Sequence, residues 1–324
     1  MMPVTGKLVI GASALLLAAG AAMAQDKYPS KPIRMLVPFP PGSASDVLAR
    51  TVGQKLGDLY GQQVVIDNRP GAGGVVGSTL ITKAAPDGYT LGMIGQPHLM
   101  QPLLQKEPPY RPLDDIASVT QVASLANVLV VSPNLPVKTT GDLIALAKQK
   151  PGQLNFGSAG IGSSSHIAGE ALKAAAGIDV VHVPFKLLGD IFTEMVAGRV
   201  HLYMFPLPAV MPMLKDGKLR VLGAGSPQPT PSLPGVPTIA GSGLPGFQSE
   251  SWFGVIAPPK LPSGIVMKLN KDIADILKTA DSKEKYLRVG AEVVFGTPEA
   301  FHKLMQAEYV KYQQLVKAAG ISAQ

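Results

Sequence analysis

Short apolar runs alternate with segments of helical periodicity along most of this 324-residue chain. Residues 33–37 (Ile-Arg-Met-Leu-Val) are a predicted buried strand, and residues 43–60 then carry apolar side chains at helical spacing. The same succession returns in the second half, where a predicted strand over 154–157 precedes a predicted helix over 164–176. Strands that alternate with helices over such a length predict α/β layers with mostly parallel sheets.

The amino-terminal segment has the three parts of a secretory signal peptide. Lys7 is its one charge, residues 8–22 are apolar, and Ala22-Met23-Ala24 supplies a small-x-small cleavage site. A membrane anchor needs about 20 apolar residues, so this stretch is too short for one. We therefore expect cleavage of residues 1–24 after Ala24 and export of a soluble, monomeric protein to the periplasm. About 300 residues remain, more than one hydrophobic core usually holds, which predicts two domains.

The composition argues against several classes of function. With no cysteine, the chain cannot use a thiol nucleophile or a zinc–thiolate site. Its formal charge of +7 comes from scattered Lys and Arg residues, so we expect no nucleic-acid surface. The five histidines lack H-x-x-x-H spacing and no G-x-S-x-G motif is present, which argues against a metal site and an enzyme. The Gly-rich segment 71–77 lacks the G-x-G-x-x-G spacing, so we expect no nucleotide or other cofactor.

Two loops place small residues and hydroxyl groups at predicted helix amino termini. Loop 1 is residues 39–46, and loop 2 is residues 157–166. Free backbone N–H groups and a partial positive charge make a helix amino terminus an anion site, and two such loops facing each other would form a closing cleft. Each loop alone could equally be an ordinary capped turn. The candidate ligand-binding residues in the two loops are Phe39, Pro41, Gly42, Ser43, Ala44, Asp46, Ser158, Gly160, Gly162, Ser163, Ser164 and His166.

Four further candidates follow predicted strands. Gln96 and His98 come at the end of a strand in the first half, although ordinary loop residues would look the same. Phe185 and Lys186 come at the end of a strand in the second half, where Lys186 could instead be a solvated lysine. Ligands of open α/β sheets bind at the carboxyl ends of strands, which is where all four lie.

Ordered blocks along the chain resemble the Bug family, the extracytoplasmic solute receptors of tripartite tricarboxylate transporters. The blocks that carry the resemblance are 28–34 (YPSKPIR), 37–42 (VPFPPG), 68–74 (NRPGAGG), 83–91 (KAAPDGYTL), 182–186 (HVPFK) and 233–238 (LPGVPT). The resemblance implies a type II periplasmic-binding-protein-like fold with two α/β domains, 27–125 plus 252–324 and 126–251, around a ligand cleft. It also implies that the two loops bind a small carboxylate through backbone amides, hydroxyls and bridging waters, without catalysis. The implied partner is the membrane permease of such a transporter, or else a sensor protein.

Some residues depart from the pattern of that family. Ser43 and Leu187 stand where the family usually has Gly, and the segment 206–208 lacks an acidic residue often seen there. A buried ammonium group needs an anionic partner, so loss of the acid disfavours amino-acid ligands. We therefore expect a carboxylate without an amino group, with an apolar or aromatic body.

Overall fold

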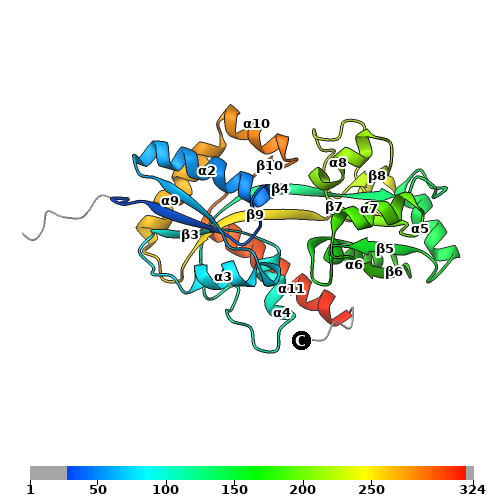
Figure 1. Ribbon diagram of the computed structural model, residues 1–324, viewed down its shortest axis with the longest axis horizontal. Coiled ribbons are helices and arrows are strands. Elements are labelled where there is room, and N and C mark those ends of the chain that lie inside the picture. Colours follow the sequence, from blue (N-terminus) through cyan, green and yellow to red (C-terminus); the bar gives the residue numbers. More distant parts are fainter. Residues whose placement is uncertain (1–27, 319–324) are drawn as a thin grey trace, which may run out of the picture.

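The structure is a computed structural model that describes residues 28–318, so the predicted signal peptide 1–24 lies outside the described residues. Two α/β lobes are joined at the strands β4 (Ala117–Val131) and β9 (Glu250–Ala257), which run antiparallel to each other (Figure 1). The described strands follow the order β2-β1-β3-β9-β4-β7-β5-β6, and β8 and β10 also pair with β4. Their bounds are β1 (Ile33–Val37), β2 (Val64–Asn68), β3 (Thr90–Gly95), β5 (Asn155–Ser158), β6 (Val181–Pro184), β7 (Leu202–Pro206), β8 (Arg220–Ala224) and β10 (Glu292–Val293).

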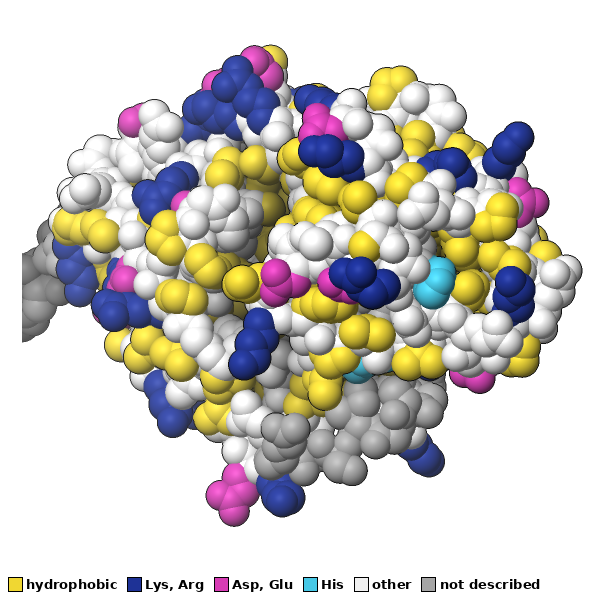
Figure 2. All heavy atoms as spheres, turned by 45° about the vertical axis from the view of Figure 1, so that its right-hand side comes forward, with side chains coloured by type: hydrophobic (Ala, Val, Ile, Leu, Met, Phe, Trp, Pro, Cys, Tyr) yellow, Lys and Arg dark blue, Asp and Glu magenta, His cyan; other side chains and the backbone are white. Residues whose placement is uncertain are grey.

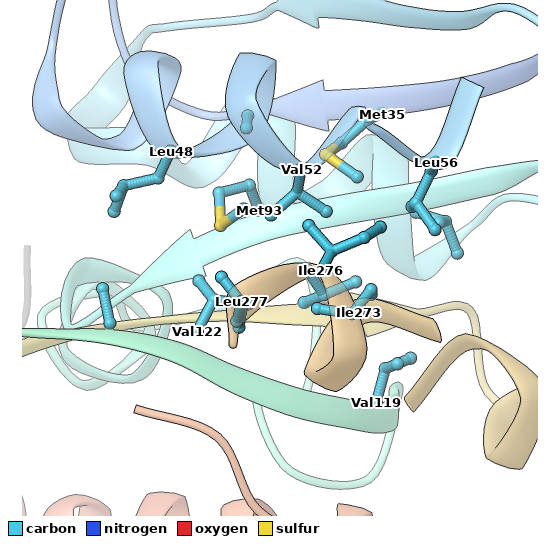
Figure 3. Close-up of a cluster of buried hydrophobic side chains, with 14 of the residues drawn as sticks. Met35, Leu48, Val52, Leu56, Met93, Val119, Val122, Ile273, Ile276 and Leu277 are labelled. Carbon is cyan, nitrogen blue, oxygen red and sulfur yellow. The ribbon is translucent and has the colours of Figure 1, made fainter. Parts of the chain in front are cut away.

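Helices cover both faces of the sheet in the first lobe. Met35 of β1 belongs to one buried cluster, with side chains of α2 (Ala44–Tyr60), α9 (Ser263–Leu277) and α10 (Ala280–Arg288) (Figure 3). Its neighbour Leu36 belongs to the opposite cluster, with side chains of α3 (Val75–Thr82), α4 (Pro97–Leu103) and α11 (Pro298–Ala318). Successive strand residues point to opposite faces, so a strand covered on both faces is apolar almost throughout.

The second lobe repeats this arrangement. Leu129 and Val131 of β4 face one cluster, which includes α5 (Thr140–Gln149) and α6 (Ser164–Ala176). Val128 and Val130 face the other, which includes α7 (Leu188–Val196) and α8 (Leu207–Lys215). Two short 3-10 helices complete the described elements, η1 (Ala72–Gly74) and η2 (Ala240–Ser242). The division into domains 27–125 plus 252–324 and 126–251 stays a prediction.

Candidate functional site

Loop 1 is held in shape by one buried carboxylate. Ser43 is the N-cap of α2, and its hydroxyl accepts a hydrogen bond from the backbone N–H of Asp46 at 3.3 Å. The Asp46 side chain in turn accepts from the N–H of Gly42, from Arg50 Nε and from Asn68 Nδ2, each at 2.9 Å. Asp46 is 3% exposed, and its carboxylate fixes the turn that precedes α2. Its role as a ligand contact stays a prediction.

The charge state of Asp46 follows from these bonds. Burial alone would raise the pKa of Asp46, but the hydrogen bonds from Arg50, Gly42 and Asn68 outweigh it and hold the pKa below its ordinary value. Loop 1 therefore keeps its acceptor at any pH above about 4.

Loop 2 is built in the same way at the start of α6. Ser163 is the N-cap, and its hydroxyl accepts from the backbone N–H of His166 at 3.2 Å. His166 Nδ1 accepts from the N–H of Gly162 at 3.1 Å, as Asp46 accepts from Gly42 in loop 1. Ser165 adds a second support, because its hydroxyl accepts from the N–H of Ala159 at 2.9 Å. Gly162 has a φ of +77°, a conformation that glycine adopts without strain.

A group of rings lies beneath loop 2. His166 stacks on His182 of β6 with ring centroids 4.1 Å apart, and His182 stacks on Phe156 of β5 at 4.7 Å. His182 Nε2 lies 2.6 Å from the hydroxyl of Ser158, and that hydroxyl also accepts from the N–H of Gly160 at 3.1 Å. His182 belonged to a family-like block of the sequence but carried no predicted role, because Ser158 lies 24 residues away along the chain.

Gln96 belongs to a hydrogen-bond network where the lobes join. Its Nε2 donates to the carbonyl of Glu250 at 3.1 Å, and its Oε1 lies 3.2 Å from the hydroxyl of Ser251. The same hydroxyl lies 3.2 Å from Asn127 Oδ1, and Asn127 Nδ2 donates to Ser249 at 2.9 Å. Both polar atoms of the Gln96 amide are thus engaged within the protein.

The other three candidates outside the loops are His98, which is buried, and Phe185 and Lys186, which follow β6. His98 is 2% exposed, stacks on Tyr110 at 4.9 Å and places Nε2 3.0 Å from the carbonyl of Pro112, so its ring has little surface to offer a ligand. Burial lowers the pKa of His98 to about 4. Phe185 donates its backbone N–H to Ser158, which holds it beside loop 2, and Lys186 is exposed.

A cavity of about 410 Å³ lies over the strands that join the lobes. One wall is α6, beginning at Ser164, and the facing wall is α11 with Glu308 and Tyr312. Gln96 and Ser164 are the predicted ligand residues that line it, so loop 2 reaches this cavity. Trp252 lines it too, and within residues 28–318 its buried indole N–H has no hydrogen-bond partner.

On the face of the molecule that Figure 2 shows, Lys and Arg side chains are scattered and do not gather into one basic patch. Among the described residues, no three His, Cys, Asp or Glu side chains gather as a metal site would require. No helix in the same part of the chain is long and apolar enough to cross a bilayer.

Two α/β lobes joined by antiparallel strands, each with a capped helix amino terminus after a parallel strand, define the class of two-lobed solute-binding proteins. Residues 48–321 match the model of the tripartite tricarboxylate transporter family receptor, and the chain belongs to that family. The family model describes receptors, and BugD, a solved structure 28% identical to this chain, is a periplasmic binding protein, so this chain is a solute-binding protein and not an enzyme. The predicted family, the predicted fold class and the predicted absence of catalysis are therefore confirmed.

Individual relatives cover nearly the whole chain. Protein BugT of Bordetella pertussis is 34% identical over 314 residues, which is 96% of each chain. The solved structure of R. palustris Rpa4515 with adipate has a TM-score of 0.78 and 34% identity, covering 91% of this chain and 99% of that one. MatC of Rhodopseudomonas palustris with bound malate has a TM-score of 0.74 and 29% identity, covering 89% and 100%.

Proposed function

We propose that this protein captures a small carboxylate between its lobes through the backbone of loop 1 and loop 2, and hands it to a membrane permease. The observation that carries the proposal is the pattern of unused backbone donors. Within loops 1 and 2 as described, the N–H groups of Ala44 and Ser45, and of Ser164 and Ser165, donate to no protein acceptor. These are the first two positions of α2 and of α6, where the helix dipole favours a negative charge.

The remaining loop residues would shape the site around those donors. Lys186 would add a positive charge near the site. The backbone of the site would be shaped by the other predicted residues, which are Phe39, Pro41, Gly42, Ser43, Ser158, Gly160, Gly162, Ser163 and Phe185. Neither loop contains Arg or Lys, so the carboxylate would be held by amides, hydroxyls and water. Adipate and malate, which the two relatives hold, are both carboxylates that such donors would suit.

The body of the ligand would meet apolar side chains. Ile161, at the tip of loop 2, is 55% exposed, and Leu187, in the loop after β6, is 66% exposed. Burying large apolar side chains against a ligand is favourable by roughly 25 cal/mol per Å². We therefore favour a carboxylate with an apolar body and no amino group.

Proline substitutions at the first helical position test the proposed donors. Pro lacks an N–H but suits that position, provided that the preceding residue is extended. Ser43 (φ −67°, ψ 162°) and Ser163 (φ −71°, ψ 159°) both meet that condition. Ala44→Pro and Ser164→Pro should therefore keep the melting temperature within a few degrees and abolish the stabilisation that a bound carboxylate gives.

Ala280→Pro is the matched control. It makes the same change at the start of α10, after the extended Thr279 (φ −67°, ψ 146°). The readout is a thermal shift of ligand-stripped protein against mono-, di- and tricarboxylates, aromatic acids and amino acids. A ligand at 100 times its Kd stabilises by about 2.7 kcal/mol, or several degrees. Equal ligand shifts in all three variants and the parent would contradict binding by these N–H groups, and a shift with aspartate or glutamate alone would contradict the ligand class.

We also propose how the chain is exported, how it divides into domains and which partner it meets. Export would remove residues 1–24 after Ala24, which the intact mass of the exported protein decides. The two domains would be 27–125 plus 252–324 and 126–251, closing on the ligand. A sensor protein could replace the permease as the partner, using the same closed form.

A further inference from the structure

The two loops differ in one chemical respect. In loop 1 the acceptor for the N–H of Gly42 is the Asp46 carboxylate, and in loop 2 the acceptor for the N–H of Gly162 is His166 Nδ1. A carboxylate keeps its lone pairs at any pH above about 4, whereas an imidazole nitrogen accepts only while it carries no proton. Protonation of His166 at Nδ1 would therefore turn an acceptor into a second donor facing the N–H of Gly162.

A second imidazole holds the other side of the same turn. His182 Nε2 contacts the Ser158 hydroxyl at 2.6 Å, and that hydroxyl lies 3.1 Å from the N and 3.2 Å from the O of Gly160. The two histidines thus support Gly160 and Gly162, one on each side of the exposed Ile161. Because their rings stack at 4.1 Å, a charge on one ring directly opposes a charge on the other.

The charged groups around the pair add to this opposition. Burial, together with smaller contributions from His166 and Lys173, lowers the pKa of His182 to about 4. Burial also lowers the pKa of His166, with Glu170 acting against that shift and Lys173 adding to it. Phe156 of β5 is the other ring in the stack. A Cβ at Gly162 would meet Gln101 of α4 and Leu104 at the C-cap of that helix, and none of these three side chains is ionisable.

We propose that His166 and His182 are positioning residues that hold loop 2 in its binding shape only while both rings are neutral, so that acidification releases the ligand. In an opened loop the imidazoles return toward their ordinary pKa of about 6.5. Between that value and the lowered one, the opened loop binds protons that the ordered loop cannot bind. The ordered loop is therefore fully favoured above about pH 6.5 and loses its advantage as the pH falls below it.

The first test is made without ligand, by NMR of imidazole and backbone signals between pH 7.5 and pH 5. We expect His166 Nδ1 to be unprotonated at pH 7.5. The amide signals of Gly160, Ile161 and Gly162 should change with the same midpoint as the two rings. A proton on His166 Nδ1 at pH 7.5, or rings that titrate near 6.5 while these amides stay unchanged, would overturn the proposal.

The second test rests on the proposed function and uses adipate as the probe. Calorimetry would compare the parent protein with His166→Asn, which keeps a neutral acceptor near the Nδ1 position but cannot titrate. Each protein is compared with itself, so the Kd of the parent should rise about tenfold more than that of the variant between pH 7.5 and pH 5.5, whatever the two affinities at pH 7.5. Protonation of adipate itself affects both proteins equally and cancels in this comparison.

A third variant tests whether any buried histidine would give the same pH dependence. His201→Asn is the matched control, because His201 Nδ1 accepts from the N–H of Asn155 at the start of β5 and its pKa is also lowered by burial. That variant should keep the pH dependence of the parent. Equal pH dependence in the parent and in His166→Asn, or tighter binding by the parent at pH 5.5, would overturn the proposal. If adipate binds none of the proteins at pH 7.5, the proposed ligand fails, and the NMR titration alone decides the role of the histidines.

Discussion

At the scale of single residues, buried polar side chains set the shape of both loops. Asp46 is a predicted ligand contact whose carboxylate the structure surrounds with Gly42, Arg50 and Asn68. The sequence could identify Asp46 as a first-turn acid, which suits the dipole of α2. It could not identify Asn68 as its partner, because that contact joins residues 22 positions apart through the pairing of β1 with β2.

Removal of this carboxylate should destabilise the protein. Asp46→Ala removes a buried carboxylate that accepts from three donors, and we expect a loss of about 3 kcal/mol in the free energy of unfolding. Asp142→Ala, at the exposed capping box of α5, is the control and should cost about 1 kcal/mol. Urea unfolding of both variants measures the difference. Since the pKa of Asp46 is lowered in the folded protein, the excess loss should be present at pH 7 and shrink as the pH falls below about 4. Equal losses in the two variants would contradict this account.

At the scale of elements, strongly periodic segments were predictable and tertiary ones were not. The predicted strand 33–37 and helix 164–176 have the bounds of β1 and α6. The mainly apolar segment 127–131 makes up only the last part of β4. The earlier part carries Ser118, Gln121 and Ser124 and so lacks an apolar run that would predict a strand. Leu59, in the last turn of α2, is 58% exposed although it belongs to the segment 43–60 with apolar side chains at helical spacing.

Three helices had no clear signal in the sequence. α4 and α8 contain Pro102 and Pro212, which ordinarily end a helix, and α10 is a short, strongly charged segment. α4 nevertheless matters to the site, because Gln101 and the C-cap residue Leu104 occupy the space that a Cβ at Gly162 of loop 2 would need. Contacts of this kind depend on how the lobes meet, which periodicity does not encode.

The fit of loop 2 against α4 can be tested by adding one methyl group. A Cβ at Gly162 would overlap Leu104 Cδ1, and its φ of +77° is unfavourable for Ala. Gly162→Ala should therefore cost about 2 kcal/mol of stability and weaken carboxylate binding. Gly177→Ala is the control for strain alone, because its φ is +59° and nothing lies within 4 Å of the added Cβ, and it should cost about 1 kcal/mol. Thermal unfolding and calorimetry on both variants check this, and an unchanged affinity in Gly162→Ala would contradict a role for the contact in binding.

At the scale of the whole molecule, contacts on more than one side connect the two lobes. Loop 2 meets α4 near the cavity, and Thr230 of the second lobe donates to Glu292 Oε1 of β10 at 2.9 Å. Thr230 is 5% exposed, so this hydrogen bond is shielded from water. Because its partners belong to different lobes, we expect the bond to break when the lobes separate and so to favour the arrangement that encloses a ligand.

A double-mutant cycle isolates this contribution from the other effects of each substitution. Thr230→Val and Glu292→Ala should each weaken carboxylate binding, and the double variant should lose less than the sum, with a coupling of about 1 kcal/mol or fivefold in Kd. The cycle matters because Thr230 also accepts from the N–H of Ser232 at 3.2 Å, a local bond whose loss cancels between the pairs of variants. Calorimetry with the ligand found in the carboxylate screen measures all four affinities. Additive losses would mean that the bond persists in the open form, and the preference for closure would then rest on the ligand and on loop 2 alone.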